Sequence, residues 1–432
     1  MNDCLFFGLN QYPILIKNKP NKITKPIQFK FENENEKQIK QIASGYFSTI
    51  FLFKNGKAIE YLNQNDSKQN LQKIQIENIQ KVTVGVQNEA ILTIEGNVFA
   101  KGKDINPKNP KEFINISSLI EDTNDRIIQD VVSGYNSIYL LTSNQNAYGI
   151  GSNFFAQLGF DSETFKKTEK PILMMKNVSK IFSGIPSYSV FLLNSNQELF
   201  GCGYNCYGQV GLEIKETEEE NMKELTKIQN IPKGKIIDIQ TGNWHSVMLI
   251  EIEDENQNQN PKRKLYSCGE PQFNGNSQTE YLTSFFEIKS SLFENDDNIL
   301  DFSVGYENTL ILTEKGKLIG FGRNINGELG TGDTEYKPIP TQIELPKLRF
   351  NENISNYHVH CGVYNSFLYY SPSFSNLEED LIKLFRRKEF CDISFKTENG
   401  EIIEAHKLIL KYRLKDYENQ IEKLQEIISK IN

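Results

Sequence analysis

The sequence is poor in several residues that mark specialised classes of protein. Its 432 residues include six cysteines, four histidines and one tryptophan, and 56 Asp and Glu outnumber 48 Lys and Arg. Six cysteines in so long a chain are too few for a disulfide scaffold. The net charge of −8 is opposite to the basic footprint of a nucleic-acid-binding protein, so no nucleic-acid partner is expected. No apolar run approaches the roughly 18 residues of a membrane span, so no membrane contact is expected either.

The beginning of the sequence has none of the features of a secretory signal. Residues Met1 to Cys4 include no basic residue ahead of an apolar stretch. The scarcity of cysteine agrees with a reducing environment. We therefore expect an intracellular protein of the cytoplasm, with the nucleus as the other possible location.

An internal repeat dominates residues 1–371. A strand-like phrase with alternating apolar residues ends in glycine seven times, at Gly45, Gly85, Gly134, Gly184, Gly242, Gly305 and Gly362. A second apolar strand follows each of these glycines, and five repeats have a third strand that ends in another glycine. Alternation of this kind places one face of each strand against a neighbouring sheet. The spacing predicts an all-β fold, a β-propeller of seven blades with loop insertions.

A further element follows the third strand in three of the repeats. It reads Asn153…Gln157-Leu158-Gly159, Asn205…Gln209-Val210-Gly211 and Asn324…Glu328-Leu329-Gly330. The first two repeats are degenerate, because residues 57–82 and 101–126 lack this element.

The two ends of the repeat array predict a closed ring. The last repeat, near residues 356–371, has two strands and no second half before the composition changes. The missing half stands at the start of the chain, where Leu5-Phe6-Phe7-Gly8 reads like the glycine-ending third strand. We therefore expect residues near 4–16 to complete the seventh blade and to leave no open sheet edge.

These phrases resemble the regulator-of-chromosome-condensation repeat family, over about residues 1–371. The resemblance implies a seven-bladed propeller. The founding member of that family binds chromatin and, while bound there, catalyses nucleotide exchange on a nuclear GTPase. Many relatives serve as interaction platforms instead. The resemblance therefore implies a protein partner, which a small GTPase could be.

The composition changes after Pro372, and residues 372–390 are predicted to be a linker helix. Next come an Asp-x-x-Phe strand at Asp392, an Asn399-Gly400 turn and an Ala405-His406-Lys407 helix start. This stretch is similar to the opening of a BTB/POZ domain over about residues 385–410. The resemblance places Asp392, His406 and Lys407 at motif positions for partner binding. It also implies a small α+β fragment over 391–432, a unit that dimerises or contacts a cullin-type ubiquitin ligase.

The last residues form a heptad pattern. Apolar side chains recur at spacings of three and four, at Leu414, Tyr417, Ile421, Leu424, Ile428 and Ile431. This spacing makes an a/d seam and predicts a short coiled-coil helix that could form a homodimer. A helix that folds back onto the hairpin or the propeller explains the same pattern.

The other candidate sites have structural explanations that we favour. Cys202 and Cys206 form a single C-x₃-C pair, and a zinc site usually needs two pairs. His358 and His360 share one strand face and fit packing better than a metal site. The Gly-x-Gly pairs at 149/151, 201/203 and 320/322 do not have the spacing of nucleotide-binding loops, so we predict no cofactor. With packing explanations for the other candidates, we also predict no metal and no catalytic residue. Glu213–Glu224 is interpreted as an acidic loop between blades.

Three functions are compatible with these patterns. The first is a non-catalytic scaffold or adaptor whose variable propeller loops bind a protein and whose tail adds dimerisation or a second contact. The second is a guanine-nucleotide exchange factor for a small GTPase, and the third is a substrate receptor of a cullin-type ubiquitin ligase. We favour the scaffold, because a rigid propeller with variable loops suits partner recognition, and the family fold alone does not assign the founding activity.

Overall fold

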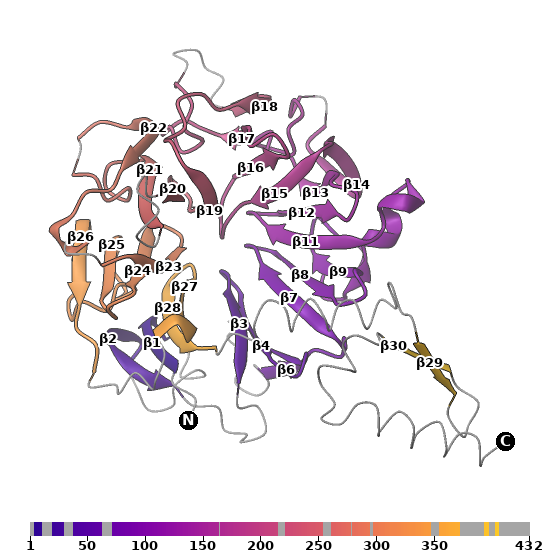
Figure 1. Ribbon diagram of the computed structural model, residues 1–432, viewed down its shortest axis with the longest axis horizontal. Coiled ribbons are helices and arrows are strands. Elements are labelled where there is room, and N and C mark those ends of the chain that lie inside the picture. The colour runs from indigo at the N-terminus through magenta and orange to yellow at the C-terminus, as the bar shows by residue number, and fades with distance from the viewer. Residues whose placement is uncertain are drawn as a thin grey trace. The chain divides into compact units, whose positions relative to one another are not determined.

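The computed structural model divides the chain into two compact units, Met1–Ser371 and Pro372–Asn432. The structure describes residues 4–10, 20–29, 38–62, 71–163, 165–214, 221–253, 261–277, 279–293, 297–346, 354–371, 393–396 and 402–405. Within these residues, the first unit holds seven four-stranded antiparallel sheets and the second holds one two-stranded sheet. The first unit is therefore the seven-bladed β-propeller that the repeat predicts (Figure 1).

Blades I to IV follow the chain in order, each from its innermost strand outwards. Blade I consists of β3 (Ile39–Ser44), β4 (Ser48–Phe53), β5 (Ala58–Leu62) and β6 (Leu71–Lys73). Blade II consists of β7 (Ile79–Val84), β8 (Asn88–Thr93), β9 (Val98–Gly102) and β10 (Ile114–Asn115). Blade III consists of β11 (Ile128–Ser133), β12 (Ser137–Thr142), β13 (Ala147–Ser152) and β14 (Lys167–Met175). Blade IV consists of β15 (Val178–Phe182), β16 (Ser189–Asn194), β17 (Leu199–Tyr204) and β18 (Asn221–Lys227).

Blades V and VI continue this order, and blade VII joins the two ends of the unit. Blade V consists of β19 (Lys235–Thr241), β20 (His245–Ile252), β21 (Lys262–Gly269) and β22 (Leu282–Glu287). Blade VI consists of β23 (Ile299–Val304), β24 (Asn308–Thr313), β25 (Leu318–Gly322) and β26 (Lys337–Ile343). Blade VII consists of β27 (Tyr357–Cys361), β28 (Asn365–Tyr370), β1 (Cys4–Leu9) and β2 (Lys22–Phe29).

The helices described in unit 1 are short 3₁₀ turns between strands. They are η1 (Ser117–Leu119), η2 (Thr123–Asp125), η3 (Ser291–Phe293) and η4 (Ile354–Asn356). In unit 2, β29 (Ile393–Lys396) and β30 (Ile402–Ala405) pair antiparallel, in the place where the sequence predicts a hairpin. The linker helix 372–390, the motif residues Asp392, His406 and Lys407, and the heptad from Leu414 to Ile431 lie outside the described residues. The BTB/POZ-like fragment and its coiled coil therefore stay predictions.

The second strand of each blade forms the core of the propeller. In β4, β8, β12, β16 and β24 every residue is buried, because both faces of the strand pack against neighbouring blades. The outermost strands are more exposed, as in β26, where buried and exposed residues mix. Apolar strands therefore lie where two sheets cover them, and charged residues collect at the outer edge, where they discourage edge-to-edge pairing.

The repeat glycines form a ring around the centre of the propeller. A Cβ added to Gly45 would collide with the carbonyl of Gly85, and one added to Gly85 would collide with that of Gly134. The same holds between Gly242 and Gly305. The ends of the innermost strands therefore approach too closely for any larger side chain, which explains why the sequence has glycine there. Figure 1 shows these strands, from β3 to β27, surrounding the centre.

Side chains of the innermost strands also tie each blade to the next. The Gln41 amide both donates to the carbonyl of Val82 (3.0 Å) and accepts from its N–H (3.1 Å). Gln240 makes the same pair of bonds between blades V and VI, with Phe302 and Val304. These bonds satisfy backbone groups of strands that have no second strand neighbour on the inner side.

The closure between the first and last strands is confirmed. Strand β1 pairs antiparallel with β28, with Cys4 opposite Tyr369 and Gly8 opposite Asn365. The ring of Phe6 lies 5.3 Å from that of Phe367, which in turn contacts Phe51 of blade I. Residues of blades VI, VII and I thus share one apolar core.

Sequence reasoning was incomplete or wrong at two places. It ended the N-terminal contribution near residue 16 and missed β2, the outer strand of blade VII. It also interpreted Glu213–Glu224 as a loop between blades, and this is wrong, because Asn221–Lys227 is β18 of blade IV and pairs with β17. An outer strand tolerates charged residues at its solvent edge, so a run of charges does not distinguish such a strand from a loop.

Candidate functional site

Aromatic residues gather on one face of the propeller, in the loops between the first and second strands. Six of the seven blades carry one soon after the repeat glycine, and blade II has Val86 instead. We call this set the aromatic belt; it consists of Tyr46, Tyr135, Tyr188, Trp244, Tyr306 and Tyr364. Because the first strands run in the same direction in every blade, these loops lie at the same end of the unit.

The belt residues contact one another across blade boundaries. Tyr135 stacks on Tyr188 with ring centroids 4.3 Å apart, and Tyr46 meets Tyr364 edge to face at 5.4 Å. Tyr204, at the end of β17, bridges Tyr188 (6.1 Å) and Trp244 (5.9 Å). Such pairs each stabilise by about 0.5–1.5 kcal/mol beyond the area they bury. The belt is therefore a preformed surface rather than a set of separate flexible side chains.

Arg323 connects Tyr306 and Tyr364 of the belt, through Glu307, to Trp244. Its guanidinium lies over the rings of Tyr306 (5.6 Å) and Tyr364 (5.1 Å). Its Nε lies 3.6 Å from Glu307, and the same carboxylate accepts a 2.7 Å hydrogen bond from the Trp244 indole N–H. A continuous chain thus runs from Trp244 through Glu307 and Arg323 to the tyrosines, and combines cation–π contacts with charge pairing.

Partial burial raises the pKa values of several belt residues and of Glu307 beside them. Desolvation raises the pKa of Glu307, and the Trp244 hydrogen bond and Arg323 oppose this rise. Desolvation also raises the pKa values of Tyr188 and Tyr364, and each rises further through a hydrogen bond, with Tyr135 and Tyr46 respectively. Tyr188 and Tyr364 therefore stay neutral hydroxyls that can donate and accept hydrogen bonds. Tyr46 is 39% exposed and the adjacent Phe47 is 42% exposed, so part of this apolar surface faces solvent.

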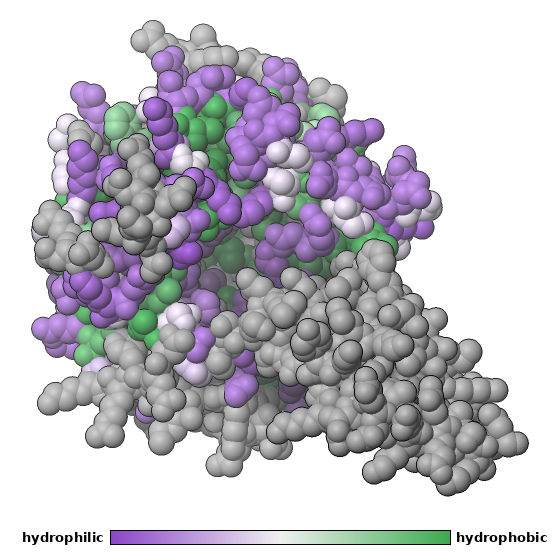
Figure 2. All heavy atoms as spheres, in the orientation of Figure 1, coloured by the Kyte–Doolittle hydropathy of each residue, from purple (hydrophilic) through white to green (hydrophobic). Residues whose placement is uncertain are grey.

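Figure 2 shows one face of the molecule, where hydrophilic residues predominate around the periphery and the centre of the propeller is hollowed.

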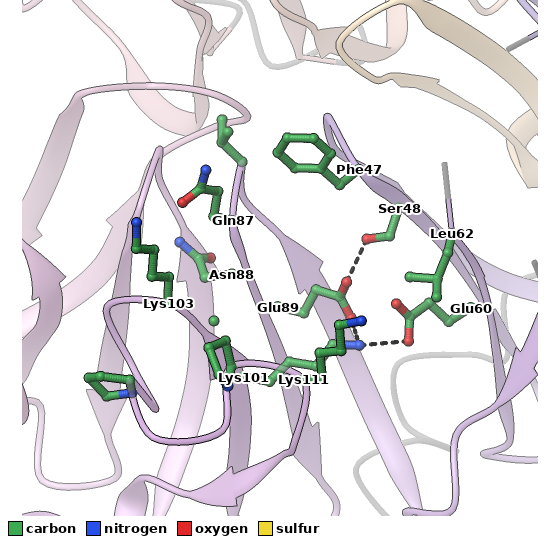
Figure 3. A pocket seen from close by; sticks show the side chains of 14 residues that line it. Phe47, Ser48, Glu60, Leu62, Gln87, Asn88, Glu89, Lys101, Lys103 and Lys111 are labelled. Carbon is green, nitrogen blue, oxygen red and sulfur yellow. Dashed lines mark hydrogen bonds and ion pairs between the residues drawn. The ribbon is translucent and has the colours of Figure 1, made fainter. Parts of the chain in front are cut away.

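A second recess, drawn in Figure 3, lies between blades I and II on the face that carries the belt, with a volume of about 490 Å³. Its lining includes Phe47 and the ionic residues Glu60, Glu89 and Lys101. We call this recess the blade I–II pocket.

The histidines and cysteines weighed in the sequence have packing roles. His360 Nε2 accepts the backbone N–H of Ser44 at 2.8 Å, which ties blade VII to blade I, and His358 lies 3.2 Å from Asp301. The Cys202 thiol is fully buried and donates to the carbonyl of Gln157. Among the described residues, no group of three or more His, Cys, Asp or Glu side chains could hold a metal ion. No helix in the described part of the chain is long and apolar enough to span a bilayer.

Sequence reasoning missed both the belt and the pocket. A signal for the belt was available, since an aromatic residue follows the repeat glycine in six of the seven phrases. The pocket left a weaker signal, Glu60 and Lys101 at third-strand positions that are uncharged in the other blades. The predicted partner-binding residues Asp392, His406 and Lys407 cannot be compared with either site, because they lie outside the described residues.

Comparison with known proteins supplies the family of the repeat. The model of the regulator of chromosome condensation (RCC1) repeat matches residues 196–249 and 315–369. The match to RCC1 repeats is thus found over these two segments of the chain. Each matched RCC1 segment begins at or just before the third strand of one blade and ends in the second strand of the next. The RCC1 unit is thus offset from the blade by two strands, which explains why the half blade at the N-terminus is needed to close the ring.

Curated relatives and solved structures agree with this fold. Human HERC4, a probable E3 ubiquitin-protein ligase, is 24% identical over 60% of this chain, and the ultraviolet-B receptor UVR8 of Arabidopsis thaliana is 21% identical over 62%. The match spans 24% of the length of human HERC4 and 58% of UVR8. The crystal structure of Prp20p from Saccharomyces cerevisiae superposes with a TM-score of 0.68, at 16% identity, over 88% of this chain and 93% of Prp20p. This likeness shows the fold.

Proposed function

We propose that this RCC1-repeat propeller is a non-catalytic interaction platform whose aromatic belt binds a protein partner. The observation that carries the proposal is the composition of the belt: tyrosines, the single tryptophan and a stacked arginine, held together at one face. Tyr, Trp and Arg are the residues that most often dominate binding energy at protein interfaces. Their contacts fix the side chains before binding, which lowers the entropy that association must overcome.

The relatives support a protein partner in general terms. The crystal structure of Prp20p was described together with its binding to Gsp1p and histones, so a propeller of this fold binds proteins. HERC4 carries the name of a ubiquitin ligase, but the match covers about a quarter of its length. Exchange-factor activity and a role as a ligase substrate receptor therefore stay predictions from the sequence, as do homodimerisation through residues 372–432 and the intracellular location.

Alanine at Trp244 is expected to weaken partner binding by at least thirtyfold, or about 2 kcal/mol, as for a central hot-spot residue. The test is quantitative affinity capture by the full chain, followed by titration of the captured partner. Binding is measured for wild type, Trp244→Ala and Tyr364→Ala. Phe286→Ala is the matched control, because Phe286 is 51% exposed on β22, an outermost strand.

Wild-type affinity in both belt variants would contradict the proposal, and so would an equal loss in the Phe286 control. Thermal unfolding of each variant separates a loss of binding from a loss of fold. A nucleotide-release assay on several small GTPases tests the exchange-factor prediction with the same proteins, and faster release would make the chain more than a platform.

A further inference from the structure

The blade I–II pocket lies where the repeat departs most from its regular pattern. In blades III, IV and VI the third strand has Gly149, Gly201 or Gly320 at one register position. A Cβ at these glycines would contact Leu158, Val210 or Leu329 too closely, and these three residues belong to the element that follows the third strand. Blade I has Glu60 at the same position, opposite Ile50, and its sequence lacks that element. Blade I therefore has a carboxylate side chain at the position where the regular blades have a glycine packed against an apolar side chain.

The neighbouring blade contributes two more charges at positions that are uncharged elsewhere. Glu89 and Lys101 face each other across β8 and β9. The equivalent pairs are Ile138 with Ile150 in blade III and Ser246 with Cys268 in blade V. Replacement of a buried ionic group by apolar residues is often neutral or stabilising, so the stability of the fold does not explain these charges.

The three ionic groups form one buried cluster, which Figure 3 shows between the two blades. The Lys101 ammonium lies 2.7 Å from Glu60 Oε2 and 3.1 Å from Glu89 Oε2. Glu89 also accepts a 2.6 Å hydrogen bond from the Ser48 hydroxyl. Glu60 is 2% exposed, and its Oε1 has no hydrogen-bond partner among the residues that the structure describes. Within the described part of the chain, two carboxylates thus share one ammonium, and one negative charge has no counter-ion there.

We propose that this pocket binds the basic side chain, an ammonium or a guanidinium group, of a protein partner. The unbalanced negative charge is buried, where charges interact far more strongly than in water. Phe47, Leu62 and Pro110 line the pocket and can pack along the methylene stem of lysine or arginine. Phe47 follows Tyr46 of the aromatic belt and contacts its ring at 4.8 Å, so one partner could engage both sites. In this respect the inference rests on the proposed function.

The pocket favours a cation over the other classes of ligand. An anion would approach the exposed Lys103 and Lys111 at the mouth but would meet the buried negative charge below them. An uncharged apolar group would desolvate that charge further without neutralising it. Lys103 and Lys111 lie in solvent, which screens their repulsion of a basic group.

Protonation of Glu89 competes with a bound cation. Burial and the nearby Glu60 raise the pKa of Glu89 to about 7, although Lys101 and the Ser48 hydroxyl oppose this rise. The charged groups around Glu89 are Glu60 on β5, Lys101 on β9, and Lys103 and Lys111 in the loop that follows. Below pH 7 the carboxyl takes up a proton and the cluster becomes neutral; above pH 7 the negative charge returns. Affinity for a cation therefore increases with pH across this range.

The test uses two small probes of equal shape, Nα-acetyl-arginine methylamide and its neutral citrulline analogue. Their binding to the full chain is measured by saturation-transfer NMR. Wild type is expected to bind the arginine probe at least tenfold more tightly than the citrulline probe, and about tenfold more tightly at pH 8 than at pH 6. Glu60→Gln and Glu89→Gln are expected to lose about tenfold of the arginine affinity at pH 8, and Glu89→Gln is also expected to lose the pH dependence. Glu198→Gln is the control, since Glu198 pairs with Lys227 on the outer part of blade IV.

Two further variants sharpen the result. Lys103→Glu with Lys111→Glu is expected to strengthen arginine binding several-fold, because it removes the cations at the mouth. Trp244→Ala is expected to bind the probe like wild type, so a failure of the belt and a failure of the pocket can be told apart. Equal binding of the two probes, no saturable binding by wild type, or wild-type affinity in Glu60→Gln would overturn the proposal.

Discussion

Phe6→Ala is expected to lower the free energy of unfolding by about 3–5 kcal/mol, the range for loss of a fully buried phenylalanine side chain. Phe6 is 0% exposed and pairs across the strands with Phe367, from the other end of unit 1. Its truncation removes apolar contacts in blade VII, which the described strands build from two distant segments of chain. The measurement is denaturant unfolding followed by far-ultraviolet circular dichroism and by the fluorescence of Trp244.

The matched control for this prediction is again Phe286→Ala. Phe286 is 51% exposed, so its loss is expected to change the free energy of unfolding by no more than about 0.5 kcal/mol. If Phe6→Ala behaved like this control, β1 would not lie in blade VII and the ring would not be closed as described.

Acid is expected to destabilise the propeller through His245, by about 3 kcal/mol between pH 7 and pH 4. His245 is fully buried, and burial lowers its pKa from 6.5 to about 3. Its Nε2 lies 2.9 Å from the Thr309 hydroxyl of the next blade, and its Nδ1 has no hydrogen-bond partner in the described segments. Because the unfolded chain takes up a proton near pH 6.5 and the folded chain does not, this stability is complete above pH 6.5. It is lost as the pH falls towards 3.

His245→Asn isolates this effect, because the repeat itself supplies the replacement. Blades II, VI and VII have Asn88, Asn308 and Asn365 at the equivalent register position. The variant is expected to fold and to lose about 3 kcal/mol less than wild type between pH 7 and pH 4. The comparison needs free energies of unfolding at several pH values for both proteins. Parallel pH profiles would show that His245 is protonated in the folded state.

Glu89 acts in the opposite direction and should be measured beside His245. Its folded pKa of about 7 lies above the ordinary value of 4.5, so its contribution favours the folded state at low pH and declines as pH increases towards 7. Glu89 thus reduces the loss of stability in acid, whereas His360, whose burial lowers its pKa to about 4, adds to that loss. The difference between wild type and His245→Asn removes the contribution of Glu89, because both proteins contain it.

The ring could be predicted from the sequence because it depends on a local and repeated requirement. Each repeat glycine allows the close approach of neighbouring innermost strands, so the same residue recurs at Gly45, Gly85 and five later positions. The half blade at the start of the chain was visible for the same reason, because Gly8 lies near the end of the third strand of blade VII. Strand β2 has no such marker, and its alternation of buried and exposed residues resembles many polar segments of this chain.

The candidate sites depend on contacts between repeats, which no single repeat records. An aromatic residue after each repeat glycine is visible in the sequence, but the chain from Trp244 through Glu307 to Arg323 joins three separate segments. The charge cluster likewise combines Glu60 of one blade with Glu89 and Lys101 of the next. Only the curvature of the ring places these residues together.

The most direct test of the account is photo-cross-linking from the belt. The full chain is made with benzoylphenylalanine in place of Tyr46, which is 39% exposed in the belt, and separately in place of Phe286 on the outermost strand of blade V. The account predicts that a defined protein partner becomes attached at position 46 and not at position 286, and that Trp244→Ala removes the product. Attachment of the same partner at position 286 alone, or at position 46 regardless of Trp244, would contradict it.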